Sequence, residues 1–359
     1  MWNFLKRHKG LHIWLLSALG LLGLYRLSIR SVSAADRLTA ATQRLKDSIG
    51  VLCSYVSFSV MECLIVALVA GLMALLVVFV YRLVKDPCKG TILYRGAMTV
   101  LCLALTGLGL YDILWGANNY ASGFQERSGI WAEPVALDDL ERVTAGMVDR
   151  LQELSPQIPR DKEGVFAVPR QEILEGALQV YAQLEEEFPF LKKEDQVPKP
   201  MAFSRLFSAM NFTGFYSPFT GESNINVDSP ACLMAANIAH ELGHQRGIAS
   251  EQECNFLAVA ASLSSGDPVY QYSGALMAYI HLGNALYRAD RDRWLQLRDR
   301  LPEGVMADLR YHSIYWDRFR GVTAEVSKKV YDSTLKAYGQ EDGIKSYGTC
   351  VDLLVAYYK

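Results

Sequence analysis

Three long apolar stretches mark the first third of the chain. Residues 10–25, 63–81 and 96–111 contain no Asp, Glu, Lys or Arg. About 20 apolar residues are needed to cross a bilayer as a helix, and a helix in a soluble core is rarely apolar for so long. The pattern therefore predicts three transmembrane helices, near residues 11–29, 60–83 and 96–115. Tyr111 and Trp115, near the end of the third, are typical of the membrane interface.

The first apolar stretch also fits a cleavable signal peptide. It follows the basic residues Lys6, Arg7 and Lys9 and precedes a run of small residues at 31–35, which is the arrangement of a secretory leader. Both interpretations place the N-terminus in the cytoplasm. We favour a retained transmembrane helix.

Basic residues in the short connections predict the orientation, because they collect on the cytoplasmic side. They precede the first helix and fill the connection between the second and third, at Arg82, Lys85, Lys89 and Arg95. The connection 30–59 is also basic, which weakens this bias without reversing it. The sequence thus predicts a multi-pass cell-membrane protein with a membrane region, 1–119, and an extracytoplasmic domain, 120–359.

The pattern of the outer part changes along its length. Helical periodicity covers 137–154 and 170–188, whereas 203–208 and 211–227 are rich in Phe, Tyr, Thr and Asn and predict two or three short strands with a turn at 218–222. A helix should follow, capped by Asp228 or Ser229 and ending at Gly247. A second helix is expected over 251–263, and 268–359 should be mostly helical. The expected fold is a mainly α (α+β) domain with a small antiparallel sheet.

Composition and charge narrow the class of protein. The 359 residues are 51% hydrophobic, with a net charge of −2, which excludes collagen-like and disordered chains. The excess of acidic residues lies in 120–359, so we expect no nucleic-acid partner. The seven cysteines are scattered and form no CxxC pair, so neither a disulfide framework nor a cysteine zinc site is indicated.

One motif carries chemistry: His240 and His244 enclose Glu241 in an HExxH sequence on a predicted helix. Residues four apart share a helix face, so two imidazoles can bind one ion, while the intervening Glu can reach a zinc-bound water and act as its general base. Apolar neighbours make two histidines and a carboxylate costly to bury without such a role. The alternative is an ordinary helix with a polar, solvent-exposed face.

The third ligand is expected just after the turn, from Glu251 or Glu253. Ser250 and Glu253 form the pattern of a capping box, which gives Glu253 a structural role. Asn255 shares a helix face with Glu251 and is suited to bond the free nitrogen of a ligating histidine. We therefore predict His240, His244 and Glu251 as zinc ligands, with Glu253 as the alternative and Asn255 behind the ligands. His and Glu ligands also suit other divalent ions.

The helix, the HExxH motif, the turn and the following Glu resemble the gluzincin type of zinc metallopeptidase. Residues 240–256 (HELGHQRGIASEQECNF) resemble, more narrowly, the bacterial domain-of-unknown-function family 3810, whose members look like membrane-anchored zinc peptidases. Residues 115–120 (WGANNY), 217–226 (SPFTGESNIN) and 345–348 (KSYG) are also similar to that family. The resemblance covers most of the chain and implies a zincin-like catalytic domain; Cys254 stands where such motifs usually carry Ala.

Two further features of a peptidase can be sought. Gluzincins bind peptide by adding it to an edge strand, and residues 214–217 or 223–227 are candidates, although an ordinary sheet explains them equally. A donor to the oxyanion is also needed. Its candidates are Tyr347, which we favour as a catalytic residue, followed by His281, His312, Tyr311 and Tyr315.

The predicted function is that of a membrane-anchored zinc-dependent peptidase acting on a peptide or protein, with the lipid bilayer as its other partner. A non-catalytic metal-binding sensor or scaffold on a membrane anchor is the main alternative, although it has no need of Glu241. An intramembrane protease is disfavoured, because Asp228, Asn237 and Arg246 bracket the HExxH helix too closely for a membrane span.

Overall fold

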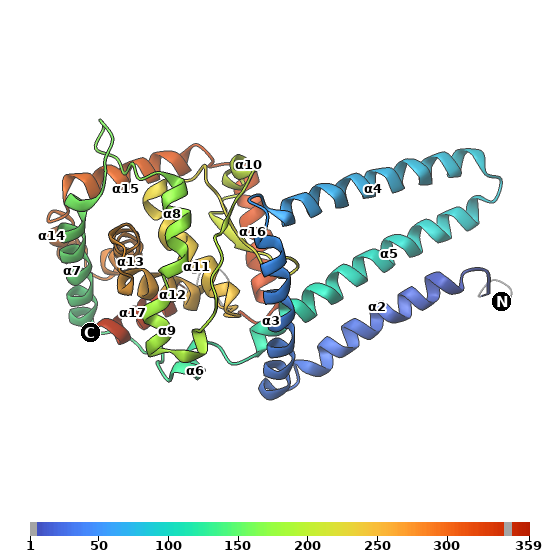
Figure 1. The fold of residues 1–359 in the computed structure, drawn as a ribbon, viewed down its shortest axis with the longest axis horizontal. Helices are drawn as coiled ribbons and strands as arrows, with labels where there is room; N and C mark the ends of the chain where they lie inside the picture. Colours follow the sequence, from blue (N-terminus) through green and yellow to red (C-terminus); the bar gives the residue numbers. More distant parts are fainter. Residues whose placement is uncertain (1–5, 341–346) are drawn as a thin grey trace.

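The computed structural model describes residues 6–340 and 347–359, and it shows a helical body from which three long helices project to one side (Figure 1). These are α2 (Lys9–Ser28), α4 (Val60–Lys85) and α5 (Lys89–Leu114). All three are long and apolar enough to cross a membrane. The predicted spans are confirmed at this level. The third helix begins earlier than expected, because its basic first two turns continue the same helix.

The N-terminal helix packs along the third apolar helix. Trp14 Nε1 of α2 donates to the Thr106 hydroxyl of α5 at 2.9 Å, and His12 Nε2 lies 2.6 Å from the Tyr94 hydroxyl. Gly109 of α5 approaches Leu21 so closely that an added Cβ would lie 3.0 Å from the Leu21 Cβ. The two helices therefore form a specific pair.

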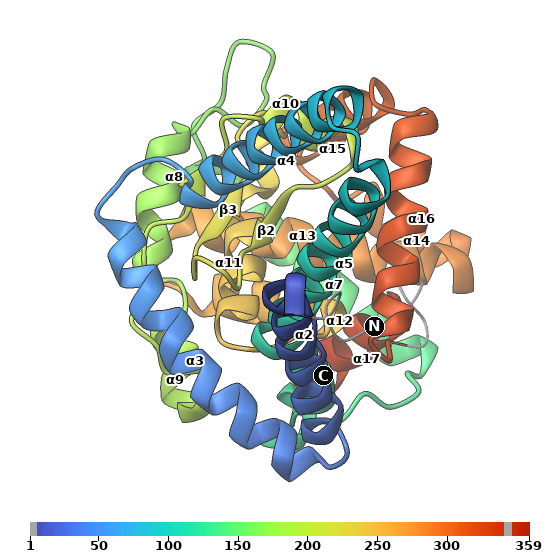
Figure 2. The same ribbon diagram turned by 90° about the vertical axis from the view of Figure 1, so that its right-hand side faces the viewer.

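The connection 30–59 is largely helical. Helix α3 (Val32–Ser54) crosses the base of the projecting helices, and α16 (Val322–Ala337) lies at the same level on the other side of α5 (Figure 2). The Ser31 side chain caps α3 by accepting from Ala34 N. Together α3 and α16 form a layer between the body and the projecting helices.

Four side chains anchor the projecting helices to the body. Glu222 accepts hydrogen bonds from the first two free amides of α4, Val60 N at 3.2 Å and Met61 N at 3.1 Å. A carboxylate at a helix N-terminus also interacts favourably with the helix dipole. In the other direction, Glu62 of α4 accepts hydrogen bonds from the amides of residues 202 and 203 of the body at 2.8 and 3.0 Å. At the end of α5, the Tyr338 hydroxyl donates to Asp112 at 2.6 Å, and Lys46 Nζ donates to the Leu114 carbonyl at 3.0 Å.

The body is a bundle of helices around α13 (Pro268–Ala289), which packs against α7 (Leu137–Leu154), α11 (Met234–Gln245) and α12 (Glu251–Ser264). The remaining helical elements surround this core: η1 (Gly116–Tyr120), α6 (Phe124–Ser128), η2 (Ser155–Gln157), α8 (Arg170–Gly176), η3 (Ala177–Gln179), α9 (Ala182–Glu187), η4 (Pro189–Leu191), α10 (Ser204–Ala209), η5 (Ala231–Leu233), α14 (Arg291–Arg298), α15 (Glu303–Asp317) and α17 (Tyr347–Tyr358).

The helix expected over 170–188 is divided into α8, η3 and α9. An added Cβ on Gly176 would meet the ring of Tyr270 at 2.7 Å, so this glycine allows α8 to end in close contact with α13. The break places the buried Tyr181 against the HExxH helix, where its hydroxyl donates to the Ala239 carbonyl.

The sheet has three short strands, β1 (Lys199–Pro200), β2 (Gly214–Tyr216) and β3 (Ser223–Ile225), in the order β1-β3-β2. The expected hairpin is confirmed, since β2 and β3 are antiparallel with Gly214 opposite Ile225. The expectation of an entirely antiparallel sheet is wrong, because β1 pairs with β3 in parallel. The strand expected at 203–208 is also wrong. This segment forms α10, in which the Ser204 hydroxyl donates to the Met201 carbonyl and accepts from Val227 N.

Candidate metal centre

The HExxH motif lies on α11, close to its end. The expected caps do not hold its start: Asp228 accepts from Tyr315, and the Ser229 hydroxyl donates to the Asn226 carbonyl. The chain enters through η5 after Pro230 instead, and α11 begins at Met234. The predicted end is confirmed, because Gly247 adopts φ 87°, a left-handed conformation that favours glycine. This turn brings α12 back alongside α11.

Three side chains converge across the turn. His240 Nε2 and His244 Nε2 lie 3.1 Å apart. Glu251, the first residue of α12, places one carboxylate oxygen 3.3 Å from His240 Nε2 and the other 3.4 Å from His244 Nε2. These residues form a group of potential metal ligands with one atom each within 4.8 Å of the others. The structure therefore brings together the three side chains that the sequence singled out.

Neighbouring acceptors fix both imidazole rings. Asn255 Oδ1 lies 2.9 Å from His240 Nδ1, and the Ile248 carbonyl lies 2.8 Å from His244 Nδ1. Both partners are acceptors in this arrangement, so each Nδ1 carries the proton and each Nε2 of a neutral ring presents a lone pair. Two lone pairs and a carboxylate oxygen then face one point, which is the arrangement of a cation site and is repulsive without positive charge.

The spacing of these atoms fits a small tetrahedral ion. Ligands 2.0–2.2 Å from a tetrahedral zinc are separated by about 3.3–3.6 Å. The two Nε2 atoms lie 3.1 Å apart, and they lie 3.3 and 3.4 Å from different oxygens of the Glu251 carboxylate, which is close to this spacing. His and Glu are also the donor types that zinc accepts in open sites with three protein ligands. The residues therefore fit a zinc ion.

Electrostatic coupling within the group is strong. Burial alone would raise the pKa of Glu251, but the two histidines hold this pKa well below its usual value. Burial alone would lower the pKa of His244, yet Cys254 and Glu251 raise it well above its usual value. Positive charge is thus favoured at this point, whether protons or a cation supply it.

Glu241 lies beside the ligand group and is only 5% exposed. Its Oε2 has no hydrogen-bond partner among the described residues, and burial raises the pKa of its carboxyl group. Gly214 of β2 makes room for it: an added Cβ would lie 2.9 Å from Glu241 Oε1 and 2.9 Å from the Asn224 carbonyl oxygen. The backbone of Tyr216 bonds to this carboxylate, and a buried carboxylate with one oxygen left free among the described residues, next to a cation site, is suited to general-base chemistry.

Glu253, the alternative ligand, faces away from the histidines. Its carboxylate accepts the amides of Phe124 at 2.9 Å and Gln125 at 3.2 Å, the first residues of α6. The Ser250 hydroxyl accepts from Glu253 N at 3.4 Å, as the capping interpretation predicts, but the Glu253 side chain caps α6 rather than its own helix. The structure therefore separates the two acidic residues by role.

Tyr331 of α16 joins the group, and sequence reasoning missed it. Its hydroxyl donates to Glu251, and burial followed by the Glu251 charge raises the pKa of this hydroxyl well above its usual value. No local signal marks Tyr331, because α16 lies far along the chain from the motif.

The other donor candidates lie elsewhere. Tyr315 bonds to Ser208 and Asp228, and His312 Nε2 accepts from Trp316. Within the described part of the chain, these two, His281 and Tyr311 do not line the cavity at the site. The side chain of Tyr347 lies outside the described residues.

A cavity of about 470 Å³ opens over the group. Its walls come from five parts of the fold: α11 with the motif, α12 with Glu251 and Asn255, β2 with residues 210–216, α16 with Ser327, Lys328 and Tyr331, and the end of α5 with Tyr111 and Trp115. The Trp115 ring stands edge-on to the His244 ring, with centroids 5.6 Å apart. The cavity is therefore shared between the body and a membrane-type helix.

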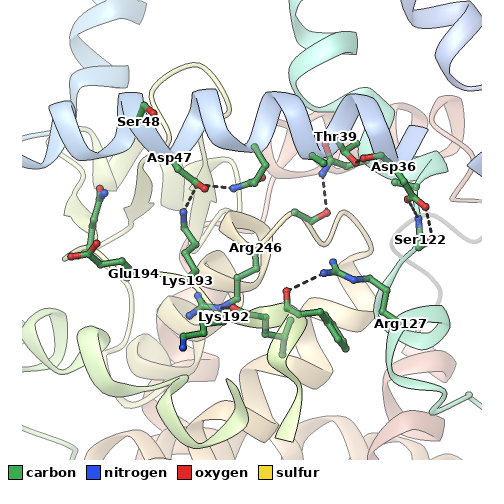
Figure 3. A pocket seen from close by; sticks show the side chains of 18 of the residues that line it. Asp36, Thr39, Asp47, Ser48, Ser122, Arg127, Lys192, Lys193, Glu194 and Arg246 are labelled. Carbon is green, nitrogen blue, oxygen red and sulfur yellow. Dashed lines mark hydrogen bonds and ion pairs between the residues drawn. The ribbon is translucent and has the colours of Figure 1, made fainter. Parts of the chain in front are cut away.

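A second cleft of about 620 Å³ lies under α3 (Figure 3). Its charges are largely paired with one another. Asp47 binds Lys193 and the Gln43 amide, and Asp36 accepts from the Ser122 amide at 2.8 Å. Arg246 on its floor is held by Asp195 at 2.8 Å and Glu185 at 2.6 Å. We interpret this cleft as the seam that joins α3 to the body.

Comparison with known proteins yields one match. A family model described as "Protein of unknown function (DUF3810)" matches residues 43–355, from within α3 to near the C-terminus. The match includes both α4 and α5 as well as the HExxH helix. No curated protein and no solved structure matches the chain.

Proposed function

The chain belongs to the DUF3810 family, and from the geometry of its site we propose that it is a membrane-anchored zinc-dependent peptidase of the gluzincin type. One observation carries the proposal. Two histidines whose Nδ1 atoms are already bonded present their Nε2 atoms to the same point as the Glu251 carboxylate, at distances close to those between zinc ligands. The intact Glu241 next to them argues for catalysis rather than for a purely structural ion.

In this proposal His240, His244 and Glu251 hold the ion. Zinc supplies Lewis-acid polarisation and activates water when bound. Glu241 accepts a proton from the attacking water and passes it to the leaving amine. Tyr331 replaces Tyr347 as our candidate for stabilising the oxyanion, because its hydroxyl lies at Glu251 and lines the cavity. Asn255 and the Ile248 carbonyl keep the two rings in the required tautomer.

Strand β2 offers a place for a peptide backbone. It lies at the edge of the sheet and lines the cavity, whereas β3 lies between two partners. Of the two segments considered from the sequence, residues 214–217 are therefore the better candidate for strand addition, in which backbone hydrogen bonds hold an extended substrate.

The membrane arrangement is proposed on the same basis. Three helices suited to spanning, with basic residues at the N-terminus and between α4 and α5, support an extracytoplasmic position for the body. The specific packing of α2 on α5 favours a retained helix over a cleaved signal peptide.

The test uses the full-length protein in detergent, loaded with zinc and mixed with a quenched-fluorescence peptide library. We expect cleavage that Glu241→Gln abolishes without releasing zinc, while Glu133→Gln, at an exposed position, leaves the rate unchanged. Stoichiometric zinc without any cleavage would support the sensor or scaffold alternative. Cleavage that survives Glu241→Gln would contradict the assignment of this site.

A further inference from the structure

The candidate site lies at the level where the membrane-type helices enter the body. Asp112 and Arg95 bracket the uncharged part of α5, and the helix between them is about 25 Å long, close to the thickness of a bilayer core. Trp115, one turn from Asp112, contacts the His244 ring. The histidines are thus one side chain away from the end of a membrane span.

Helix α16 lines the cavity together with the end of α5, and it has two different faces. Ser327, Lys328 and Tyr331 line the cavity. Val322, Val326 and Val330, spaced four residues apart on the opposite face, are 77%, 54% and 62% exposed. Val330 lies with Leu108 of α5 and Tyr25 of α2 around a separate hollow, so the valine face looks toward the membrane helices.

A second apolar element lies beside the start of α4. Phe203 and Leu206 of α10 are 48% and 55% exposed. The amide of Phe203 is bound by Glu62 in the first turn of α4, which ties α10 to the start of that span. The residues that follow α10 line the cavity next to β2. Exposed apolar side chains therefore flank the site where water meets the bilayer, and patches of this kind mark membrane or partner contact.

We propose that the substrate is a polypeptide anchored in the same membrane, and that it is cut in the segment that emerges from the bilayer. This rests on the proposed peptidase function and names its substrate class. A segment paired with β2 passes the last turn of α5, and an extended chain advances about 3.3 Å per residue. Because Trp115 at the end of α5 and Glu241 line the same cavity, such a segment reaches the carboxylate of Glu241 soon after it leaves the hydrocarbon.

The exposed apolar side chains of α16 and α10, which we call the apolar rim, select membrane-anchored substrates in this proposal. Valines of α16 and Phe203 of α10 accept the apolar end of an emerging helix, while β2 takes the extended residues beyond it. A soluble peptide gains nothing from this rim and must also reach a cavity whose walls include α5 and α16. Anchoring at the correct height, rather than a side-chain pocket, then selects the substrate.

The experiment reconstitutes the full-length protein in phosphatidylcholine vesicles with three probes. Each carries the same randomised ten-residue library, joined to a synthetic transmembrane helix by 5 linker residues, joined by 40 Gly/Ser residues, or left free. The 40-residue linker keeps the anchor but lets the library move about 35 Å away on average. We expect the short-tether probe to be cut at least tenfold faster than either of the others. Equal rates, or faster cutting of the free library, would overturn the proposal.

A binding readout separates this proposal from the peptidase assignment. A photocrosslinking residue placed at Phe203 or Val326 in the Glu241→Gln protein should capture the short-tether probe and not the free one. The same residue at Leu178, exposed on η3 of the body, should capture neither. Crosslinks without cleavage by the wild type would reject the peptidase function and retain the docking surface. Crosslinks to lipid alone would reject the docking surface.

Discussion

Two cavities adjoin the layer between the body and the membrane-type helices. They differ in whether their charged side chains are paired with groups of opposite charge. In the cleft under α3, Asp47 binds Lys193 (Figure 3), and Arg246 binds two carboxylates below it. In the cavity beside α16, two imidazole nitrogens and a carboxylate face one another with their other hydrogen bonds already made. A cluster of charged or polar residues therefore indicates a bound ion only when its members do not neutralise one another.

The largest effect is expected at Glu241. Glu241→Gln keeps the shape of the side chain but removes the base, so kcat/KM should fall by up to about 10⁴-fold in the library assay. The melting temperature should not fall, because burial raises the pKa of this carboxyl group and so opposes its ionisation. If Glu241→Gln retained activity, the cavity beside α16 would not be the catalytic site, and the contrast between the two cavities would have no functional meaning.

In the α3 cleft, Arg246 tests whether paired charges contribute to stability rather than to activity. Its side chain is 1% exposed, and it binds Asp195 and Glu185 while stacking on the Tyr181 ring at 3.7 Å. Arg246→Ala should lower the free energy of unfolding by about 3–5 kcal/mol, since it leaves buried carboxylates unpaired. Denaturation in detergent measures this loss. If stability is unchanged, the pairing in this cleft is not structural.

Asn255 tests whether the hydrogen bond that holds the His240 ring contributes to metal binding. Asn255→Ala removes the acceptor that holds the His240 ring, and loss of such a partner weakens zinc binding by about 10–100-fold. Competition with a zinc chelator measures the change. Asn284→Ala, on the solvent side of α13, is the control and should bind zinc normally.

A histidine outside the site gives the smallest effect. His312 Nε2 accepts the Trp316 indole N–H at 3.0 Å, which requires the unprotonated ring, and burial lowers the pKa of His312. The unfolded chain therefore takes up this proton at a higher pH than the folded one, so stability is full above pH 6.5 and declines below it. His312→Gln should lose less stability than the wild type between pH 7 and pH 5. Melting curves at the two pH values compare them, and an equal loss would show that His312 does not titrate on unfolding.

Local patterns predicted the parts of the molecule that local forces determine. The three apolar helices follow from uninterrupted hydrophobic runs, and the turn at Gly247 and the i, i+4 spacings placed His240, His244, Glu251 and Asn255 together. The failures depend on distant contacts. Segment 203–208 has strand-like residues but is helical because Ser204 bonds to Val227, just after β3, and Glu62 binds the amide of Phe203 to α4. Tyr331 reaches Glu251 from a helix about 80 residues away, and the capping partner of Glu253 lies on α6.

Zinc titration of two neighbouring acidic variants tests the central claim most directly. Isothermal titration of the full-length protein in detergent should show one zinc site in the wild type. Glu251→Ala should weaken this site at least 100-fold, whereas Glu253→Ala should retain its affinity and lose only stability through α6. The reverse order, with Glu253→Ala losing zinc and Glu251→Ala keeping it, would contradict the site, and no zinc binding by the wild type would contradict the metal centre itself.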